Sequence, residues 1–202
     1  MVFRPVLGLA LLCLFAAPAL AQQTPAPPQR IRGDITKVEG DMVTVKTHSG
    51  DLVTVKLAEK VAVTGVKKAD FSEVTQGKFV GIASRPGPGG TLVALEVLVF
   101  PESARGSNEG HYPWDLAPDS MMTNANIAAS VDSTNGRELT LTPKGGSVKI
   151  DVPQNVPVVT FAPGDRAMLV AGAHVLVIAV KGADGSLTAP RVLVGIGIVP
   201  PM

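Results

Sequence analysis

The chain has few of the side chains that carry covalent or metal chemistry. Its 202 residues include one cysteine, one tryptophan, one tyrosine and three histidines, and aromatic residues make up only 4%. The single cysteine, Cys13, lies in an N-terminal apolar segment, so the rest of the chain has no thiolate nucleophile, no disulfide and no cysteine-based metal site. No Ser-His-Asp order, paired-carboxylate motif, P-loop or dinucleotide fingerprint is present. The sequence therefore predicts a protein that is not an enzyme.

The chain also lacks an excess of charge of either sign. It has 18 basic and 17 acidic residues and a formal net charge of +1. This balance does not provide the basic surface on which nucleic-acid binding depends. Beyond the N-terminal segment, no apolar run is long enough to cross a bilayer as a helix. We therefore expect no nucleic-acid partner and no membrane span.

The N-terminal segment has the pattern of a secretory signal peptide. Arg4 provides a positive charge, residues 6–17 are wholly apolar, and Ala19-Leu20-Ala21 is a small-x-small cleavage site. We expect cleavage after Ala21, which removes Arg4 and leaves 17 basic and 17 acidic residues. Residues 22–30 are rich in proline and glutamine and are expected to form a flexible leader. The predicted location is the periplasm or the extracellular medium.

The remaining chain has the alternation of β-strands. In Val43-Thr44-Val45-Lys46 and in residues 52–57, β-branched or apolar side chains alternate with Thr or Lys, and glycine-containing turns separate these runs. Short strands with regular turns indicate an all-β barrel or sandwich. The strands are expected near residues 32–38, 42–47, 52–57, 61–64, 78–84, 91–100, 126–131, 138–142, 147–152, 156–160, 174–180 and 188–199.

The strand pattern occurs twice. Gly77 and Gly90 of the first copy correspond to Gly172 and Gly185 of the second without a gap. A repeat of this length indicates a duplicated structural unit. The sequence predicts a first β-barrel at residues 31–100, an inter-domain loop at residues 101–125 and a second β-barrel at residues 126–202. Each barrel is expected to resemble the oligonucleotide/oligosaccharide-binding (OB) fold, with one helical turn after Asp70 or Asp165, and two small sandwiches are the alternative.

The first unit resembles a known family. The resemblance lies in residues 32–40 (RGDITKVEG), Gly50-Asp51, residues 71–80 (FSEVTQGKFV) and residues 90–94 (GTLVA). These motifs are similar to a widespread bacterial exported β-barrel domain of unknown function, which is OB-like and often occurs in tandem. The match covers nearly all of the first unit and is weaker in the second. The family has no established activity, so the resemblance implies an exported location and a barrel architecture and says nothing about catalysis.

The rare side chains are concentrated in the expected inter-domain loop. His111, Tyr112, Trp114 and Asp115 lie within five residues and include the only tyrosine and the only tryptophan. Two interpretations are open: the aromatic rings pack across the barrel junction, or the loop is a contact surface. The sequence predicts a non-enzymatic binding or adaptor protein that contacts a small ligand or a periplasmic protein through these four residues.

One alternative is a soft-metal site for Cu(I) or Ag(I). Its ligands would be His111, Met121 and Met122, with the ring of Trp114 covering the cation. This set resembles the periplasmic copper/silver chaperone, an OB-like barrel that uses one histidine, two methionines and one tryptophan. That family carries its ligands on barrel strands, whereas these residues are expected in a loop, and no other cofactor is expected.

A second alternative is a hydrolase with an unfamiliar site. Glu109, His111 and Asp115 of the same loop have the side chains that an acid–base group needs. Any polar loop offers such side chains, so the spacing of these three residues does not by itself indicate catalysis.

Overall fold

The protein folds almost entirely into β-strands. The computed structural model describes residues 27–133 and 136–200, which form twelve strands and four 3-10 turns. The expected signal peptide and residues 22–26 of the expected leader lie outside the described residues. Strand β1 begins at Gln29, so the last two residues of the expected leader belong to the fold. The prediction of an all-β barrel protein is confirmed.

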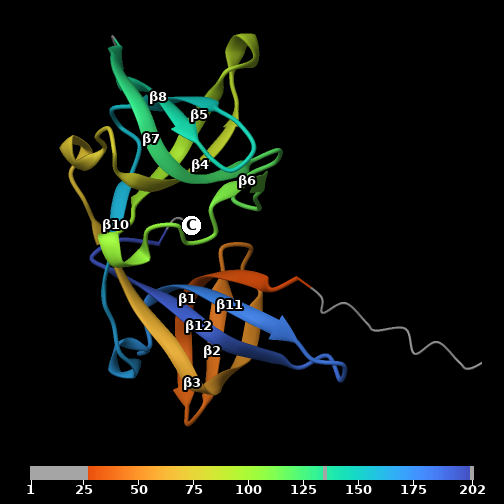
Figure 1. The fold of residues 1–202 in the computed structure, drawn as a ribbon. Helices are drawn as coiled ribbons and strands as arrows, with labels where there is room; N and C mark the ends of the chain where they lie inside the picture. Colours follow the sequence, from red (N-terminus) through yellow and green to blue (C-terminus); the bar gives the residue numbers. More distant parts are fainter. Residues whose placement is uncertain (1–26, 134–135, 201–202) are drawn as a thin grey trace, which may run out of the picture.

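Strands from the two ends of the chain form one closed ring, which we call the terminal barrel. Its members are β1 (Gln29–Glu39), β2 (Met42–Thr47), β3 (Leu52–Lys68), β11 (His174–Lys181) and β12 (Leu187–Ile196). They pair in the order β12-β11-β1-β2-β3, and a parallel pairing of β3 with β12 closes the ring. In Figure 1 the orange and blue strands of this barrel form the lower part of the molecule.

Strands from the middle of the chain form a second closed ring, the central barrel. Its members are β4 (Phe79–Pro86), β5 (Leu92–Val99), β7 (Met121–Ser133), β8 (Gly136–Thr142) and β9 (Val148–Pro153). They pair in the order β5-β4-β7-β8-β9, and a parallel pairing of β5 with β9 closes the ring. Strand β10 (Val158–Pro163) pairs with both β5 and β3 and so connects the two barrels.

The division into sequential barrels at 31–100 and 126–202 is corrected by this pairing. Strands β1–β3 of the first half pair with β11 and β12 of the second, while β4 and β5 pair with β7 and β9. The physical cause is β3, which is continuous over 17 residues where two strands with a turn were expected. A strand of this length runs past its own barrel and carries the following β4 into the other one (Figure 1).

The two halves are related by an approximate two-fold axis that passes between β3 and β10. These strands are antiparallel, and Val66 lies opposite Phe161. Phe161 follows Val66 by 95 positions, the same separation as between Gly77 and Gly172. Lys68 lies opposite Val159, the counterpart of Thr64, and Thr64 lies opposite Pro163, the counterpart of Lys68. This reciprocity is the mark of a two-fold contact.

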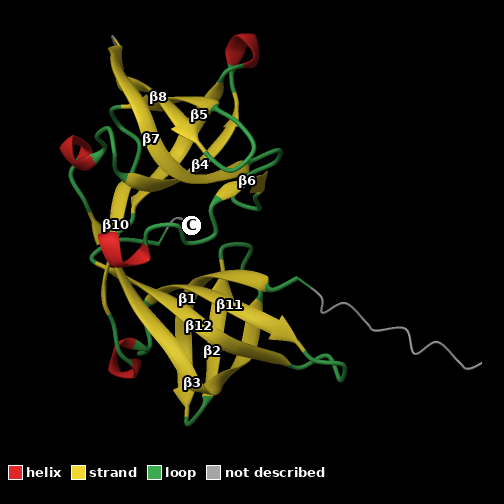
Figure 2. Ribbon diagram, viewed as in Figure 1, coloured by secondary structure: helices red, strands yellow, loops and turns green. Residues whose placement is uncertain are grey.

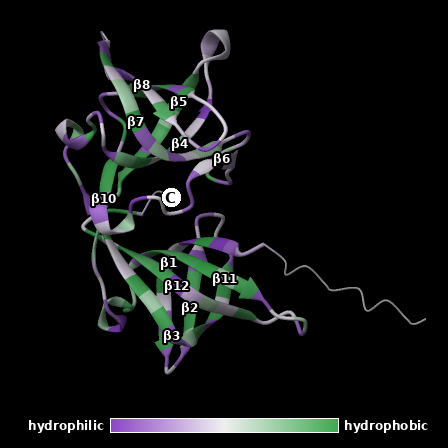
Figure 3. Cartoon of the chain, in the orientation of Figure 1, coloured by the Kyte–Doolittle hydropathy of each residue, from purple (hydrophilic) through white to green (hydrophobic). Residues whose placement is uncertain are grey.

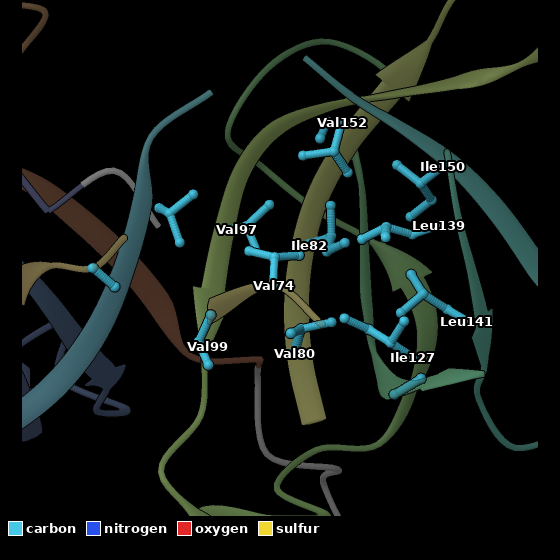
Figure 4. Packing of buried hydrophobic residues seen from close by; sticks show 14 residues of the cluster. Val74, Val80, Ile82, Val97, Val99, Ile127, Leu139, Leu141, Ile150 and Val152 are labelled. Carbon is cyan, nitrogen blue, oxygen red and sulfur yellow. The ribbon is translucent and has the colours of Figure 1, made fainter. Parts of the chain in front are cut away.

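Each barrel has its own apolar core, and a third cluster fills the junction. In the central barrel, Ile82, Leu139 and Ile150 are fully buried and point into the same interior (Figure 4). In Figure 3 hydrophobic segments lie along the strands and are interrupted by paler and hydrophilic ones, as expected when side chains alternate between the core and the surface. The junction cluster consists of Val66, Leu98, Val159, Leu176 and Leu193. Burial of these residues stabilises the contact between the barrels.

Short helical turns occur only at connections (Figure 2). In η1 (Phe71–Glu73), the Asp70 carboxylate accepts a hydrogen bond of 2.8 Å from the Ser72 amide, and Glu73 accepts one of 3.1 Å from the Asp70 amide. The predicted capping box is therefore confirmed. The Asp165 carboxylate caps η4 (Arg166–Met168) by accepting a hydrogen bond of 2.7 Å from the Ala167 amide, without a reciprocal glutamate. Within the described ranges, no helix has the length and hydropathy needed to cross a membrane.

Candidate functional site

The segment between the two halves, residues 101–120, is held against the central barrel, and we call it the strap. It contains η3 (Glu102–Ala104) and β6 (Gly110–Pro113), and β6 pairs with β7. The guanidinium of Arg105 donates hydrogen bonds to the carbonyl of Gly77 at 3.1 Å and to Glu102 at 2.8 Å. The expected loop is thus largely ordered, and its last five residues, 121–125, belong to β7.

Tyr112 is fixed by the neighbouring strand. Its hydroxyl accepts a hydrogen bond of 3.0 Å from the side-chain amide of Asn124, which also donates to the carbonyl of Asn108 at 3.1 Å. Burial raises the pKa of Tyr112 above its ordinary value, although the charge of Arg30 acts in the opposite direction. Tyr112 is therefore a neutral hydroxyl group held in one position.

Trp114 stands at the centre of a stacked group. Its backbone amide donates to the carbonyl of Ser120 at 2.7 Å, which closes a turn of the strap. The Tyr112 ring meets the indole edge-on at a centroid distance of 6.1 Å. The guanidinium carbon of Arg30 lies 3.8 Å from the centroid of the indole ring. This geometry is a cation–π contact between the strap and β1 of the terminal barrel.

Asp115 connects the strap to the same strand by charge. Its carboxylate accepts a hydrogen bond of 2.8 Å from Arg32 and lies 3.6 Å from Arg30. Burial raises the pKa of Asp115, but the hydrogen bond from Arg32 and the charges of both arginines outweigh it, so the pKa falls below its ordinary value. Asp115 is thus an anion at neutral pH, and it joins the two barrels.

A cavity of about 580 Å³ lies between the barrels beneath the strap. Its apolar surface comes mainly from the junction, where Leu98, Leu176 and Leu193 are joined by the rings of Phe100 and Phe161. Tyr112 and Trp114 line it from the strap, and Arg30 and Arg191 supply positive charge. The indole Nε1 of Trp114 is buried and has no hydrogen-bond acceptor among the residues that the structure describes. A buried donor of this kind carries an energetic penalty until an acceptor reaches it.

The structure brings together three of the four predicted contact residues. Tyr112 and Trp114 line the cavity, and Asp115 fixes the arginines beside it. His111 lies on the other face of β6, is exposed, and forms a hydrogen bond of 2.8 Å with the hydroxyl of Thr123. His111 therefore does not contribute to the cavity.

The residues of the soft-metal alternative do not converge. His111 is in register with Thr123, whereas Met122 is in register with Tyr112 and lines the cavity. Met121 and Met122 are adjacent on β7, so their side chains project to opposite faces. Within residues 27–133 and 136–200, no group of three His, Cys, Asp or Glu side chains can hold a metal ion. Glu109, His111 and Asp115 accordingly form no common cluster.

Several residues of the site were not predicted from the sequence. Arg30 was assigned to the leader. Neither Arg30 nor Arg32 is close to Trp114 in the sequence, and they come near it only because β1 forms a barrel with strands from the other half of the chain. Asn124 fell in the expected loop. Glu96 offered a signal, because it is the single charged residue of the apolar strand β5.

Glu96 is an unusual buried acid near this site. It is 1% exposed, and neither carboxyl oxygen has a hydrogen-bond partner among the described residues. Burial raises its pKa to about 8, although the charge of Arg32 acts against this. Glu96 is in register with Ala83, and Ala83 with Met122, so the carboxyl group lies on the cavity-facing side of the central barrel.

Comparison with known proteins gives no relative on which to base a function. No family model, no curated protein and no solved structure matches the chain.

Proposed function

We propose that this chain is a non-enzymatic binding protein that takes a small ligand into the cavity between its two barrels. The observation that carries the proposal is the cavity of about 580 Å³, in which apolar junction residues face Tyr112 and Trp114. Ligand sites in proteins are commonly concave, of 300–1,000 Å³, largely apolar, and provided with a few polar groups. The unpartnered indole Nε1 of Trp114 is such a group.

The fold type agrees with a binding role. Each ring is a five-stranded barrel closed by one parallel pairing, and a 3-10 turn follows β3 in the first half and β10 in the second, which supports an OB-like architecture for both barrels. The family resemblance noted in the sequence adds an exported location. We therefore propose that the protein acts in the periplasm or outside the cell after cleavage behind Ala21. Intact mass of the exported protein tests this, and retention of Met1 would contradict it.

The binding proposal is tested by ligand screening on the mature full chain. Compounds that raise the unfolding temperature of the wild type should fail to raise that of Trp114→Ala, because the indole lines the cavity. Thr36→Ala, which alters an exposed residue of β1 away from the cavity, is the control and should respond like the wild type. Stabilisation by the same compounds in all three proteins would contradict the cavity as the site, and a screen without any stabilising compound would contradict a small-ligand function.

The soft-metal alternative makes a different prediction. Cu(I) bound by His111, Met121 and Met122 should quench the emission of Trp114, and Met122→Leu should abolish the quenching. The opposite faces of Met121 and Met122 give this alternative less support than the cavity. Unchanged emission of Trp114 on addition of Cu(I) would contradict the soft-metal alternative.

A further inference from the structure

We propose that the ligand of this cavity is an amphipathic anion, with an apolar body and a single negatively charged head group. This inference rests on the proposed binding function and specifies its ligand class. It depends on the separation of apolar and charged groups around the cavity, on the charge of those groups, and on one unpartnered donor of a residue that lines it.

The apolar and charged surfaces of the cavity come from different residues. The body of the ligand would lie against the junction, where Leu98, Leu176 and Leu193 are at most 6% exposed. These three side chains present hydrocarbon only. The alkyl or aromatic body of the ligand leaves water when it lies against this wall, and the burial of its apolar surface provides the main free energy of binding.

The charged side of the cavity is positive. Arg191, an exposed residue of β12, lines the cavity, and its side chain has no ion pair or hydrogen bond with any residue that the structure describes. Arg30 also lines it, and its charge is shared with Asp115 at 3.6 Å. Glu109 is the one acidic residue among the described residues that line the cavity. A guanidinium without a carboxylate partner is suited to bind a carboxylate, sulfonate or phosphate oxygen.

Trp114 provides a further polar contact. Its buried Nε1 can only donate a hydrogen bond, and no described residue accepts one from it. If the head group displaces the side chains that cover this donor, any oxygen of the head group can accept its hydrogen bond, whereas an ammonium group cannot. Trp114 therefore disfavours a cation, and the Arg191 guanidinium favours an anion over a neutral molecule of the same length.

The test uses three probes with the same alkyl chain: decanoate, 1-decanol and decyltrimethylammonium, each below its micelle concentration. Binding to the mature full chain is followed by calorimetry and by the emission of Trp114, which reports on this site alone because the chain has one tryptophan. We expect decanoate to bind about tenfold more tightly than 1-decanol, the factor that a charge-assisted hydrogen bond supplies. Decyltrimethylammonium should bind more weakly than either.

Two variants and one control assign the effect to residues. Arg191→Gln should reduce the preference for decanoate over 1-decanol to about twofold, since it removes the charge and leaves the apolar wall. Ser107→Phe places a ring at an exposed position beside the cavity and should weaken both probes. Arg85→Gln changes an exposed arginine of β4 that does not line the cavity and should leave all affinities unchanged.

The outcomes separate the two proposals. Equal binding of decanoate and 1-decanol would overturn the anionic class while leaving the cavity as a binding site. A preference for decanoate that survives Arg191→Gln would also overturn the inference. If none of the probes changes the emission of Trp114 or gives measurable heat, the small-ligand function itself fails together with the inference.

Discussion

Val66 of β3 lies directly opposite Phe161 of β10, its own counterpart in the second half of the chain. The axis that relates the halves therefore passes through the middle of this pair, and neither half closes a barrel alone. Each barrel takes three strands from one half and two from the other. The single chain therefore has the geometry of a strand-exchanged dimer whose two subunits have been joined into one polypeptide.

A chain that contains only the first half is therefore expected to dimerise. Residues 22–104 include β1–β5, and two copies can supply both barrels, with Val66 of one copy facing Val66 of the other. We expect a dimer by light scattering and a β-type circular dichroism spectrum that is lost on dilution, because the dissociated half leaves open sheet edges. A folded monomer that persists on dilution would contradict the exchanged arrangement.

Substitution at the axis provides the matched test of that dimer. Val66 is fully buried, so Val66→Asp places two like charges at the axis of the half-chain dimer and should abolish it. Val38→Asp changes a residue of β1 that is 38% exposed and should leave the dimer intact. If both variants dimerise equally, residue 66 does not lie at the contact.

Glu96 predicts an unusual dependence of stability on pH. Its pKa is about 8 in the folded protein against an ordinary value of 4.5, because burial disfavours the charged form. The folded state holds a proton that the unfolded state releases, so this contribution to stability is complete below pH 4.5 and is lost as the pH rises towards 8. We expect the free energy of unfolding to fall across this window, by up to about 1.4 kcal/mol per pH unit.

Glu96→Gln is the matched variant for this dependence. It keeps the size of the side chain and removes the titration, so the free energy of unfolding should change much less between pH 5 and pH 8 than in the wild type. Urea denaturation at four pH values measures the two slopes. Equal slopes in both proteins would assign the pH dependence to other groups.

The local structure could be predicted from the sequence, because it depends on neighbouring residues. The alternation in Val43-Thr44-Val45 and the Asp70–Glu73 capping box correctly indicated β2 and η1. The assignment of strands to barrels could not be predicted in this way. Alternation specifies which face of a strand is buried but not which copy of a repeated strand it pairs with.

For the candidate site, too, the local features could be predicted from the sequence and the contacts between distant residues could not. The rarity of Tyr112 and Trp114 drew attention to the strap, and both residues line the cavity. Their partner Arg30 is 84 positions from Trp114 and becomes its neighbour only because β1 pairs with β11 beneath the strap. The long β3 is the physical origin of that arrangement, and its missing turn had no clear sequence signal, since Ala58-Glu59-Lys60 suits either a turn or a polar stretch of strand.

The last prediction concerns the attachment of the strap to the terminal barrel. Asp115→Asn removes the anion that binds Arg32 at 2.8 Å and Arg30 at 3.6 Å. Because the Asp115 side chain is 46% exposed, water screens the pair, and we expect a loss of roughly 1–2 kcal/mol at pH 7. The pKa of Asp115 is lowered in the folded state, so its contribution is present above the ordinary value of 3.8 and is lost as the pH falls below it. The variant and the wild type should therefore become equally stable near pH 2.

Asp132→Asn, which alters the exposed pair with Arg137, is the control and should cost at most about 1 kcal/mol. An effect of Asp115→Asn no larger than that of the control would mean that the strap is held by the stacking of Arg30 on Trp114 and by β6 rather than by charge.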